Sequence, residues 1–274
     1  MPPRVAAPPS STETPPGDPT DRPDPLDFRG RVVLVTGATT GVGRGVARRF
    51  RDRTATVVVC ARNPPEEPLP DGIEFAVCDV RDPDAIQRLV DGVVAAHGRL
   101  DVAVNNAGGG PPAESATASP RFSEAIVRLN LLGPLYLCQA ANRVMQEQEE
   151  GGSIINMGSL SALRPSPNTA AYAAAKAGLL SLTQTLAMEW APRVRVNAVS
   201  PGAARTEKSH LFYGDEAGIA RVGATVPMGR LAEPGDVGDA CLFLASPLAA
   251  YVTGANLVLH GGGERPPYIE AATT

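Results

Sequence analysis

Seven short runs of mostly β-branched apolar residues alternate with helix-like segments, and this alternation limits the possible folds more than any other feature. The apolar runs span residues 31–36, 56–61, 73–78, 100–105, 153–157, 194–199 and 255–259. The helix-like segments span residues 42–51, 83–97, 122–146, 170–189 and 234–244. Nearly continuous apolar runs are typical of parallel strands covered on both faces. The pattern therefore predicts one α/β domain, a doubly wound parallel sheet with helices on both sides.

Residues 1–27 differ in composition from the rest of the chain. Nine of the 27 prolines lie there, with two arginines, five acidic residues and hardly any large apolar side chain. Such a segment cannot bury enough apolar surface to offset the entropy of ordering it. We therefore expect a disordered proline-rich tail over 1–27, a folded domain over 28–262 and a short C-terminal tail over 263–274.

The charge balance excludes several classes of function. A net charge of −4 and a pI near 5.5 provide no basic surface for nucleic acid or acidic lipid. No uncharged apolar run reaches the roughly 18 residues of a membrane span, and the N-terminal segment lacks the apolar core of a signal peptide. We expect a cytoplasmic protein that contacts neither nucleic acid nor membrane.

The cysteines and histidines form no pattern typical of a metal site or a disulfide framework. They are widely spaced and contain no Cys-x-x-Cys pair: Cys60, Cys78, Cys138 and Cys241, and His97, His210 and His260. Two of the cysteines end apolar runs, where a small buried thiol is common. We predict no metal, and thiols that serve only packing.

A glycine-rich turn follows the first apolar run directly. It reads TGATTGVG over residues 36–43 and leads into a helix-like segment. Glycines in such a turn let the backbone approach a pyrophosphate, whose charge lies against the amides at the helix N-terminus. A glycine-rich turn alone is a weak signal, but its position between the first strand and the first helix favours dinucleotide binding.

Further motifs follow in an order that identifies a family. They are Asp79-Val80 after the third strand, Asn105-Asn106-Ala107-Gly108 after the fourth, Asn130, Ser159, the Tyr172–Lys176 stretch YAAAK, and Pro201-Gly202 with Thr206. With the glycine turn, this set resembles the short-chain dehydrogenase/reductases across residues 28–262. The resemblance implies a Rossmann-type sheet of seven strands in one domain, and an oxidoreductase that transfers a hydride between NADP(H) or NAD(H) and a secondary alcohol or ketone.

The pair Tyr172 and Lys176 can also be argued from physical chemistry. Four residues apart in a helical stretch, they project from the same face. An ammonium ~5 Å from a phenol, at an effective dielectric of ~20, favours the phenolate by about 3 kcal/mol. That is roughly two pKa units, which would bring the phenol towards physiological pH. A lone Tyr/Lys pair is usually a solvated helix pair, and the family context reverses this interpretation.

The resemblance assigns a role to each catalytic residue. Tyr172 would exchange a proton with the substrate oxygen, and Lys176 would lower the tyrosine pKa and bind the nicotinamide ribose. Ser159 would hydrogen-bond the substrate oxygen. Asn130 would hold a helix distortion and a water that passes protons from Lys176. Ser161, a nearby second hydroxyl, does not match the family spacing.

The resemblance also assigns the coenzyme site. Its residues are Gly37, Thr39, Thr40, Gly41, Val42, Gly43, Arg62, Asp79, Val80, Asn106, Ala107, Gly108, Tyr172, Lys176, Pro201, Gly202, Ala204 and Thr206. We expect Asp79 to contact the adenine. After the second strand the chain has Arg62 where an acidic residue would favour NAD, and a guanidinium suits a 2′-phosphate. We therefore expect NADP(H) to be preferred. An Arg62 that instead stacks on adenine would be compatible with either coenzyme, so NAD(H) remains possible.

Residues 207–230, which we call the lid, follow the sixth strand and cover the active site in relatives. They mix apolar residues such as Leu211, Phe212 and Tyr213 with polar ones. A lid over an apolar alcohol or ketone and an ordinary surface helix are both compatible with this pattern. A lone His210 in such a segment is usually solvated. The dispersed basic residues there do not indicate a phosphorylated substrate.

Three functions stay open, and the assembly is expected from resemblance alone. The first is a dehydrogenase for an apolar steroid- or terpenoid-like alcohol. The others are a 3-oxoacyl-thioester reductase of fatty-acid or polyketide type, and a non-catalytic nucleotide-binding redox sensor. The small partner is thus an alcohol or ketone, and relatives imply a homotetramer or homodimer through the 122–146 and 170–189 segments. His260 departs from the usual Asp-Gly-Gly ending, which affects the expected subunit contacts.

Overall fold

The computed structural model describes residues 24–264 and 272, and within them seven strands form one parallel sheet. In chain order the strands are β1 (Val32–Thr36), β2 (Thr56–Ala61), β3 (Ile73–Val77), β4 (Val102–Asn105), β5 (Gly152–Met157), β6 (Val194–Pro201) and β7 (Asn256–Leu259). Their spatial order is β3-β2-β1-β4-β5-β6-β7, and every neighbouring pair is parallel. This confirms the predicted Rossmann-type α/β domain.

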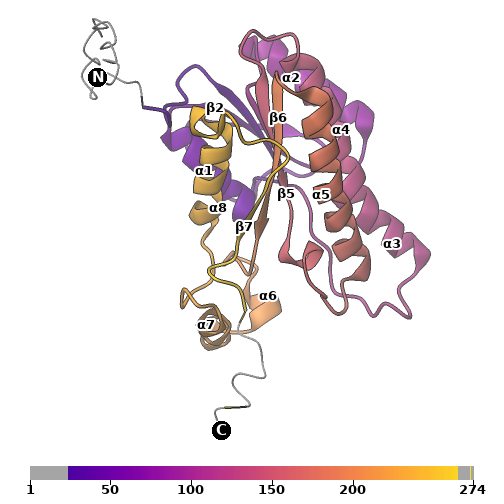
Figure 1. Ribbon diagram of the computed structural model, residues 1–274. Coiled ribbons are helices and arrows are strands. Elements are labelled where there is room, and N and C mark those ends of the chain that lie inside the picture. Colours follow the sequence, from indigo (N-terminus) through magenta and orange to yellow (C-terminus); the bar gives the residue numbers. More distant parts are fainter. Residues whose placement is uncertain (1–23, 265–271, 273–274) are drawn as a thin grey trace, which may run out of the picture.

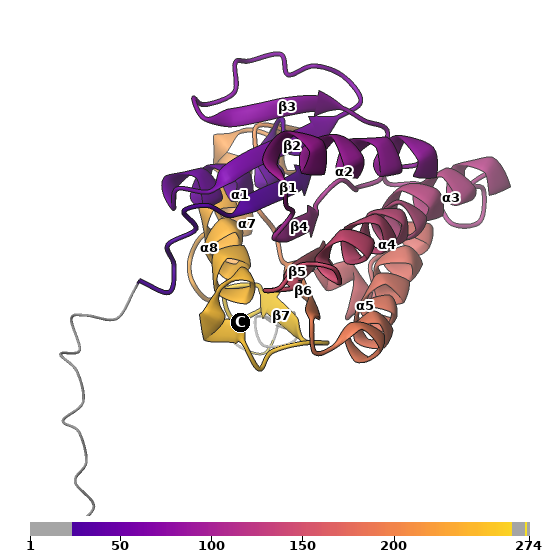
Figure 2. The same cartoon turned by 90° about the horizontal axis from the view of Figure 1, so that it is seen from above.

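Helices cover both faces of the sheet (Figure 1). In chain order the helices are α1 (Gly41–Asp52), α2 (Pro83–His97), α3 (Pro120–Val127), α4 (Gly133–Met145), α5 (Ala170–Trp190), α6 (His210–Tyr213), α7 (Glu216–Thr225) and α8 (Pro234–Ala245), of which α6 and α7 lie beyond the end of the sheet (Figure 1). The view from above separates α1 and α8 on one face from α2, α4 and α5 on the other (Figure 2). Each layer encloses its own apolar cluster: Phe50 and Leu244 lie in the first, Leu137 and Leu186 in the second.

Local sequence explains where individual elements begin and end. Asp82 accepts a hydrogen bond from the Asp84 amide at 3.0 Å, and Pro83 occupies the first helical position of α2. The same helix ends at Gly98, whose φ of 76° is costly for any other residue. Most strand bounds lie within a residue or two of the apolar runs, because strands buried on both faces require such runs.

The segment 122–146 is the main departure from the expected elements. It was predicted as one helix, but α3 and α4 are separated by a π-helical turn at Arg128–Leu132. Within this turn the Gly133 amide donates to the Arg128 carbonyl, five residues back. Pro134 follows, and its ring removes the amide that would continue a regular α-helical ladder towards Asn130. The turn therefore marks a distortion with a local cause.

The two predicted tails are described only at their inner ends. Of residues 1–27, the structure describes 24–27, where the Asp27 amide donates to the Asp24 carbonyl and Leu26 packs near the α1 cluster. Beside them Phe28 is buried edge-on against Phe50, with ring centroids 5.1 Å apart. Residues 1–23 and most of 263–274 lie outside the described residues.

Candidate active site

The chain turns sharply between β1 and α1. Gly37 and Gly41 have φ values of 63° and 59°, which glycine adopts at little cost. A Cβ on Gly37 would lie 2.7 Å from the Cα of Ala107, and one on Gly43 would overlap the Asn106 side chain. The glycines are therefore required for the turn to pack against the segment after β4. A turn this narrow lets backbone amides approach a phosphate group closely.

Hydrogen bonds fix this turn to the segment after β4. The Asn106 side-chain amide donates to the carbonyls of Thr36 and Gly37, both at 2.9 Å. The Thr36 hydroxyl accepts from the amides of Asn106 and Ala107 at 3.1 and 3.0 Å. The strand order reverses between β1 and β4, which is where ligands bind in open α/β sheets. Asn106 therefore holds together the two sides of the expected coenzyme site.

A cleft of about 500 Å³ lies at this edge of the sheet, and most of the predicted coenzyme residues line it. Those that do are Gly37, Thr39, Thr40, Val42, Gly43, Arg62, Asp79, Val80, Asn106, Ala107, Gly108, Tyr172, Lys176 and Pro201. The shape and the donor set fit a dinucleotide: a glycine turn at a helix N-terminus lies at one part of the cleft and ionisable side chains at another.

Four predicted coenzyme residues do not line this cleft. Ala204 forms a bridge with Ala232, and Gly202 lies against His260. Thr206 lines a second cavity instead. Gly41 is also absent from the cleft wall, and its amide donates to a carboxylate of the lid, described below.

The end of the cleft beside β2 and β3 carries Arg62 and Asp79. The Asp79 carboxylate accepts from the Arg81 guanidinium at 2.6 and 2.9 Å, and this ion pair lowers the pKa of Asp79. Asp79 was expected to contact adenine, but its carboxylate is already paired with Arg81. The exposed Arg62 makes no hydrogen bond or ion pair with any described residue. Its guanidinium is therefore available to a ligand in the cleft.

Tyr172 lies in the first turn of α5, beside Ser159 at the end of β5. The Ser159 side chain lies close enough to interact with the phenol, and its oxygen accepts a hydrogen bond from the Ser161 amide at 3.1 Å. Burial raises the pKa of Tyr172 above its ordinary value, and the neighbouring Ser159 hydroxyl partly opposes this shift. The Ser161 hydroxyl donates instead to Ser166 at 3.2 Å. Of the two candidate serines, Ser159 is therefore the one that contacts the tyrosine.

Lys176 lies one turn further along α5 and is only 2% exposed. Its Nζ donates to the Met157 carbonyl at 2.7 Å and lies 5.8 Å from the centre of the Tyr172 ring. Burial lowers the pKa of Lys176 to about 8. The chain has 23 arginines and only two lysines, and both Lys176 and Lys208 line the cleft. A lysine can release its proton near neutral pH, whereas an arginine cannot.

The direction of the tyrosine pKa shift was wrong in the sequence-based argument. From the spacing alone, the ammonium of Lys176 is expected to lower the pKa of Tyr172, whereas burial raises it. Two features explain the difference. The phenol is largely removed from water, and the ammonium is held against the Met157 carbonyl. Tyr172 is therefore a neutral phenol at physiological pH.

Asn130 is fully buried at the centre of the π-helical turn. Its side-chain oxygen accepts from the Gly109 amide at 2.8 Å, and its amide donates to the carbonyls of Gly109 and Ile126 at 2.9 Å each. A Cβ on Gly108 would lie 2.8 Å from the Asn130 oxygen and 3.2 Å from Lys176 Nζ. Asn130 therefore fixes the loop after β4 next to the buried lysine.

Comparison with known proteins agrees with this geometry. A model of the short-chain dehydrogenase/reductase family, described as enoyl-(acyl carrier protein) reductase, matches residues 37–264. The chain belongs to the short-chain dehydrogenase/reductase family. It is 36% identical over 255 residues to a D-threitol dehydrogenase from Mycolicibacterium smegmatis. This match covers 86% of this chain and 95% of the relative. It is 35% identical over 250 residues to 3beta-hydroxysteroid dehydrogenase 1 from Eggerthella lenta, covering 86% and 94%.

A solved structure supports the same assignment. The ligand-free aldohexose dehydrogenase of Thermoplasma acidophilum superposes with a TM-score of 0.81 at 32% sequence identity. The match covers 86% of this chain and 95% of the other. The protein is thus an NAD(P)(H)-dependent oxidoreductase of this family that acts on alcohol or ketone groups.

Beyond the cleft, the structure of this oxidoreductase shows what other predicted features do. No helix in the described part of the chain is both long and apolar enough to cross a membrane. The described residues bring together no group of three or more His, Cys, Asp or Glu side chains suited to a metal. All four cysteines are free and buried, and Cys60 and Cys78 also line the cleft, a position that their spacing did not indicate.

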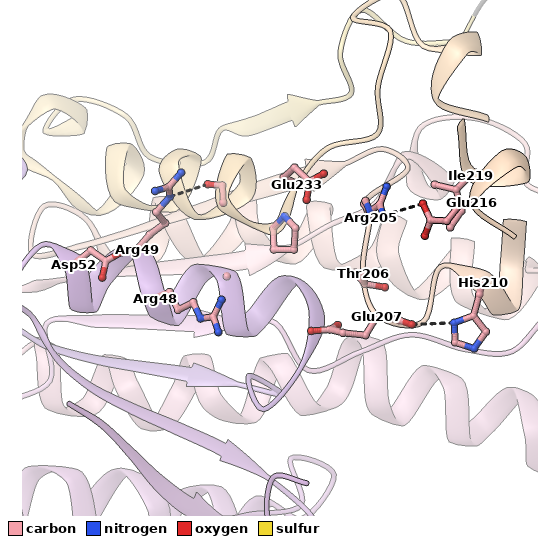
Figure 3. A pocket seen from close by; sticks show the side chains of 13 residues that line it. Arg48, Arg49, Asp52, Arg205, Thr206, Glu207, His210, Glu216, Ile219 and Glu233 are labelled. Atoms are coloured by element: carbon pink, nitrogen blue, oxygen red, sulfur yellow. Dashed lines mark hydrogen bonds and ion pairs between the residues drawn. The ribbon is translucent and has the colours of Figure 1, made fainter. Parts of the chain in front are cut away.

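A second cavity of about 550 Å³ lies between the outer side of α1, the start of α8 and the lid (Figure 3). It is polar, and Arg48, Arg205, Glu207 and His210 are among the side chains that line it. His210 hydrogen-bonds the Glu207 carbonyl through Nδ1 at 2.9 Å, so it belongs to this cavity rather than to the cleft.

Sequence reasoning missed two lid residues beside the dehydrogenase cleft. Lys208 lines the cleft, and the Glu207 carboxylate accepts from the Gly41 amide at 3.0 Å. The sequence feature that could have indicated both residues is their position immediately after Thr206, which was already assigned to coenzyme binding. Nothing in the sequence indicates that Glu207 contacts a turn 166 residues away.

Proposed function

We propose that this protein is an NADP(H)-preferring dehydrogenase that interconverts an apolar secondary alcohol and its ketone. One observation carries the proposal: a partly buried, neutral Tyr172 lies beside Ser159 and next to the buried Lys176, at a dinucleotide-sized cleft. A redox sensor without turnover needs no buried amine beside a partly buried phenol, because removing both groups from water costs free energy.

The catalytic groups divide the proton chemistry between them. When bound, the nicotinamide would supply or accept the hydride. Because burial raises the pKa of Tyr172, its phenol carries a proton at neutral pH and can donate it to a ketone oxygen. Ser159 can donate its hydroxyl hydrogen to the same oxygen as negative charge develops there. In the reverse direction, Tyr172 must first lose its own proton, which a neutral Lys176 can accept, and the phenolate then receives the proton of the alcohol.

Lys176 and Asn130 support the tyrosine in different ways. With a pKa of about 8, Lys176 is mostly protonated at pH 7 yet can release its proton, which suits a group that restores the tyrosine after each turnover. Asn130 acts as a positioning residue, because its three hydrogen bonds hold Gly109 and the helix turn beside that lysine. Its amide and carbonyl are occupied by backbone groups, so its role is to fix the loop.

Arg62 supports the preference for NADP(H). It lines the cleft without an ionic partner in the described chain, and the nearby Asp79 is paired with Arg81. A free guanidinium attracts a 2′-phosphate, and a paired carboxylate repels it less than a free one would.

The apolar substrate is supported by exposed side chains of the lid and its surroundings. Leu211 and Phe212 in α6 are 67% and 64% exposed, and Leu163 in the loop after β5 is 48% exposed. Large apolar groups left in water gain free energy when an apolar ligand covers them. One relative acts on a hydroxysteroid according to its name, and the D-threitol and aldohexose enzymes are named for polar alcohols.

Self-assembly belongs to the same proposal. The outward face of α5 carries small residues, and Ala170, Ala174 and Ala177 are exposed within this chain. Small side chains let two helices approach closely, so α5 suits contact with a second copy in a homodimer or homotetramer.

The test is coenzyme oxidation with parallel coenzyme binding. Purified protein is mixed with NADPH or NADH and with cyclic apolar ketones, keto-sugars and 3-oxoacyl thioesters. We expect turnover of an apolar ketone with NADPH preferred. Tyr172→Phe should lose about 1,000-fold in kcat, because it removes the proton donor, and should still bind NADPH. Tyr251→Phe, which alters a fully exposed tyrosine, is the matched control.

Each outcome addresses a separate part of the proposal. Activity that survives Tyr172→Phe would contradict the assignment of the proton donor. A preference for NADH would contradict the role of Arg62 alone. Turnover of keto-sugars or thioesters in place of apolar ketones would contradict the substrate class and leave the catalytic residues in place.

A further inference from the structure

Glu207 reaches from the first position of the lid to the glycine turn. Its carboxylate oxygen accepts a hydrogen bond from the Gly41 amide at 3.0 Å. Figure 3 shows the side chain extending from the loop after β6 towards α1. Thr206 packs on the same glycine, and its methyl group would lie 3.5 Å from a Cβ placed there. The start of the lid is therefore in direct contact with the turn that a dinucleotide would use.

The N-terminus of α1 has no acidic partner of its own. The Thr40 side chain accepts no hydrogen bond at the helix cap, and the first turn contains no Asp or Glu. The free amides at a helix N-terminus carry partial positive charge and bind carboxylates or phosphates. Glu207 supplies that negative group from a distant part of the chain, at an amide suited to the coenzyme diphosphate.

The surroundings offer the carboxylate a second position. Glu207 also lines the second cavity of about 550 Å³, whereas the next residue, Lys208, lines the coenzyme cleft. The same cavity contains Arg48, whose guanidinium makes no hydrogen bond or ion pair within residues 24–264. The other acidic side chain of the lid in this cavity, Glu216, is already paired with Arg205 at 2.9 Å. A displaced Glu207 carboxylate would thus find both space and an unpaired cation.

We propose that Glu207 competes with the coenzyme diphosphate for the amide of Gly41, so that coenzyme binding displaces the first residues of the lid. Two negative groups cannot share one backbone donor, and the free energy of the Glu207 contact is subtracted from coenzyme binding. Glu207 is then a determinant of coenzyme affinity that also links the cleft to the lid. This inference rests on the proposed dehydrogenase function, because it assumes that the cleft binds a dinucleotide.

The test is the dissociation constant for NADPH in three variants of Glu207. Glu207→Ala removes the competing group, and Glu207→Gln removes its charge; we expect NADPH to bind about five- to tenfold more tightly to both. Glu207→Asp keeps the charge but shortens the side chain by one methylene, and should gain about two- to threefold because the contact with Gly41 is weakened. Inorganic diphosphate, titrated alone, should show the same order of affinities.

The matched control is Glu216→Gln, which removes a negative charge from the same lid without touching α1. Its NADPH affinity should stay within about twofold of the unmodified protein, since its carboxylate is paired with Arg205. Thermal unfolding of each variant without coenzyme verifies that the chain is folded. Titrations followed by reduced-nicotinamide fluorescence measure binding independently of turnover.

The outcomes separate this inference from the proposed function. If the unmodified protein binds neither NADPH nor NADH, the proposed function fails. If it binds NADPH and the folded Ala and Gln variants bind no more tightly, the competition is wrong and the dehydrogenase assignment stands. An Asp variant identical to the unmodified protein, beside a tighter Gln variant, would indicate a general charge effect and would overturn the direct contact.

Discussion

The wall of the cleft built by β4, β5 and α5 differs from the lid in how its residues are held. In the wall, the Asn105 amide donates to Asn156, whose own amide donates to Thr183, both at 2.9 Å. All three side chains are buried, and Thr183 lies two turns after Lys176 in α5. Buried polar groups connected in this way specify one arrangement, because any slip leaves a donor or acceptor unpaired.

The lid is held by fewer and more exposed contacts. The Arg205–Glu216 ion pair is solvent-exposed, and such pairs contribute at most about 1 kcal/mol. The apolar side chains of α6 are mostly in water. The groups proposed to transfer protons are thus held by buried hydrogen bonds, whereas the proposed lid is held mainly by exposed contacts. Variants in the wall should therefore affect chemistry, and variants in the lid should affect binding.

The largest effect on chemistry after loss of the tyrosine is expected at Lys176. Lys176→Met should lower kcat by about 100-fold, because the group that restores the tyrosine proton is lost. The measurement is steady-state turnover with NADPH across pH 6–9.5. Arg88→Met, which removes an exposed cation on α2, is the control and should leave kcat unchanged. Full activity in the methionine variant would contradict a catalytic role for this amine.

The same variant should be more stable at neutral pH. Because the pKa of Lys176 falls from 10.5 to about 8 on folding, its charge destabilises the native state by about 3 kcal/mol at pH 7. Losing the hydrogen bond to the Met157 carbonyl costs about 1 kcal/mol, so the free energy of unfolding of the variant should rise by about 2 kcal/mol at pH 7. Between pH 8 and 9.5 the unfolded chain binds the proton and the folded chain releases it, so the unmodified protein recovers stability. In urea unfolding, the difference in unfolding free energy between the variant and the unmodified protein should be smaller at pH 9.5 than at pH 7.

A smaller effect is expected at Asn130. Asn130→Ala removes a fully buried side chain and leaves the part-buried amide and carbonyl of Gly109 without their partner, which should cost about 2–3 kcal/mol of unfolding free energy. As the loop beside Lys176 loosens, kcat should fall about tenfold with little change in KM. Asn142→Ala, on α4, loses a half-buried bond to Gln146 and serves as the control. An unchanged kcat at temperatures well below unfolding would show that the role is structural only.

The two regions also differ in how far sequence could predict them. The strands and most helices could be predicted, because buried strands require apolar runs. The meeting of the glycine turn, Tyr172 and Lys176 at one cleft could also be predicted, because these motifs have fixed spacings. The π-helical turn could not be predicted from the apolar pattern, which continues through 122–146; only the family resemblance indicated a helix distortion at Asn130. The raised pKa of Tyr172 depends on burial, which only the fold determines.

Lid contacts were the least predictable. The bond between Glu207 and Gly41 joins residues 166 positions apart, and no local pattern indicates it. The short helices α6 and α7 contain glycines and exposed apolar residues, so their periodicity is weak. The wall was easier to predict than the lid, because burial imposes strict residue types on the wall and exposure imposes few on the lid.

The smallest effect is expected in the lid, at Phe212. Phe212→Ala removes a ring that is 64% exposed, so the free energy of unfolding should change by no more than about 0.5 kcal/mol. For an apolar ketone, KM should rise about three- to tenfold, because the ring would bury apolar surface against the substrate, while kcat stays within about twofold. Leu248→Ala, which alters a side chain that is 57% exposed and lies next to α8, is the control. A fall in kcat with KM unchanged would place this lid residue among the groups that act on the chemistry, and the division between wall and lid would then be wrong.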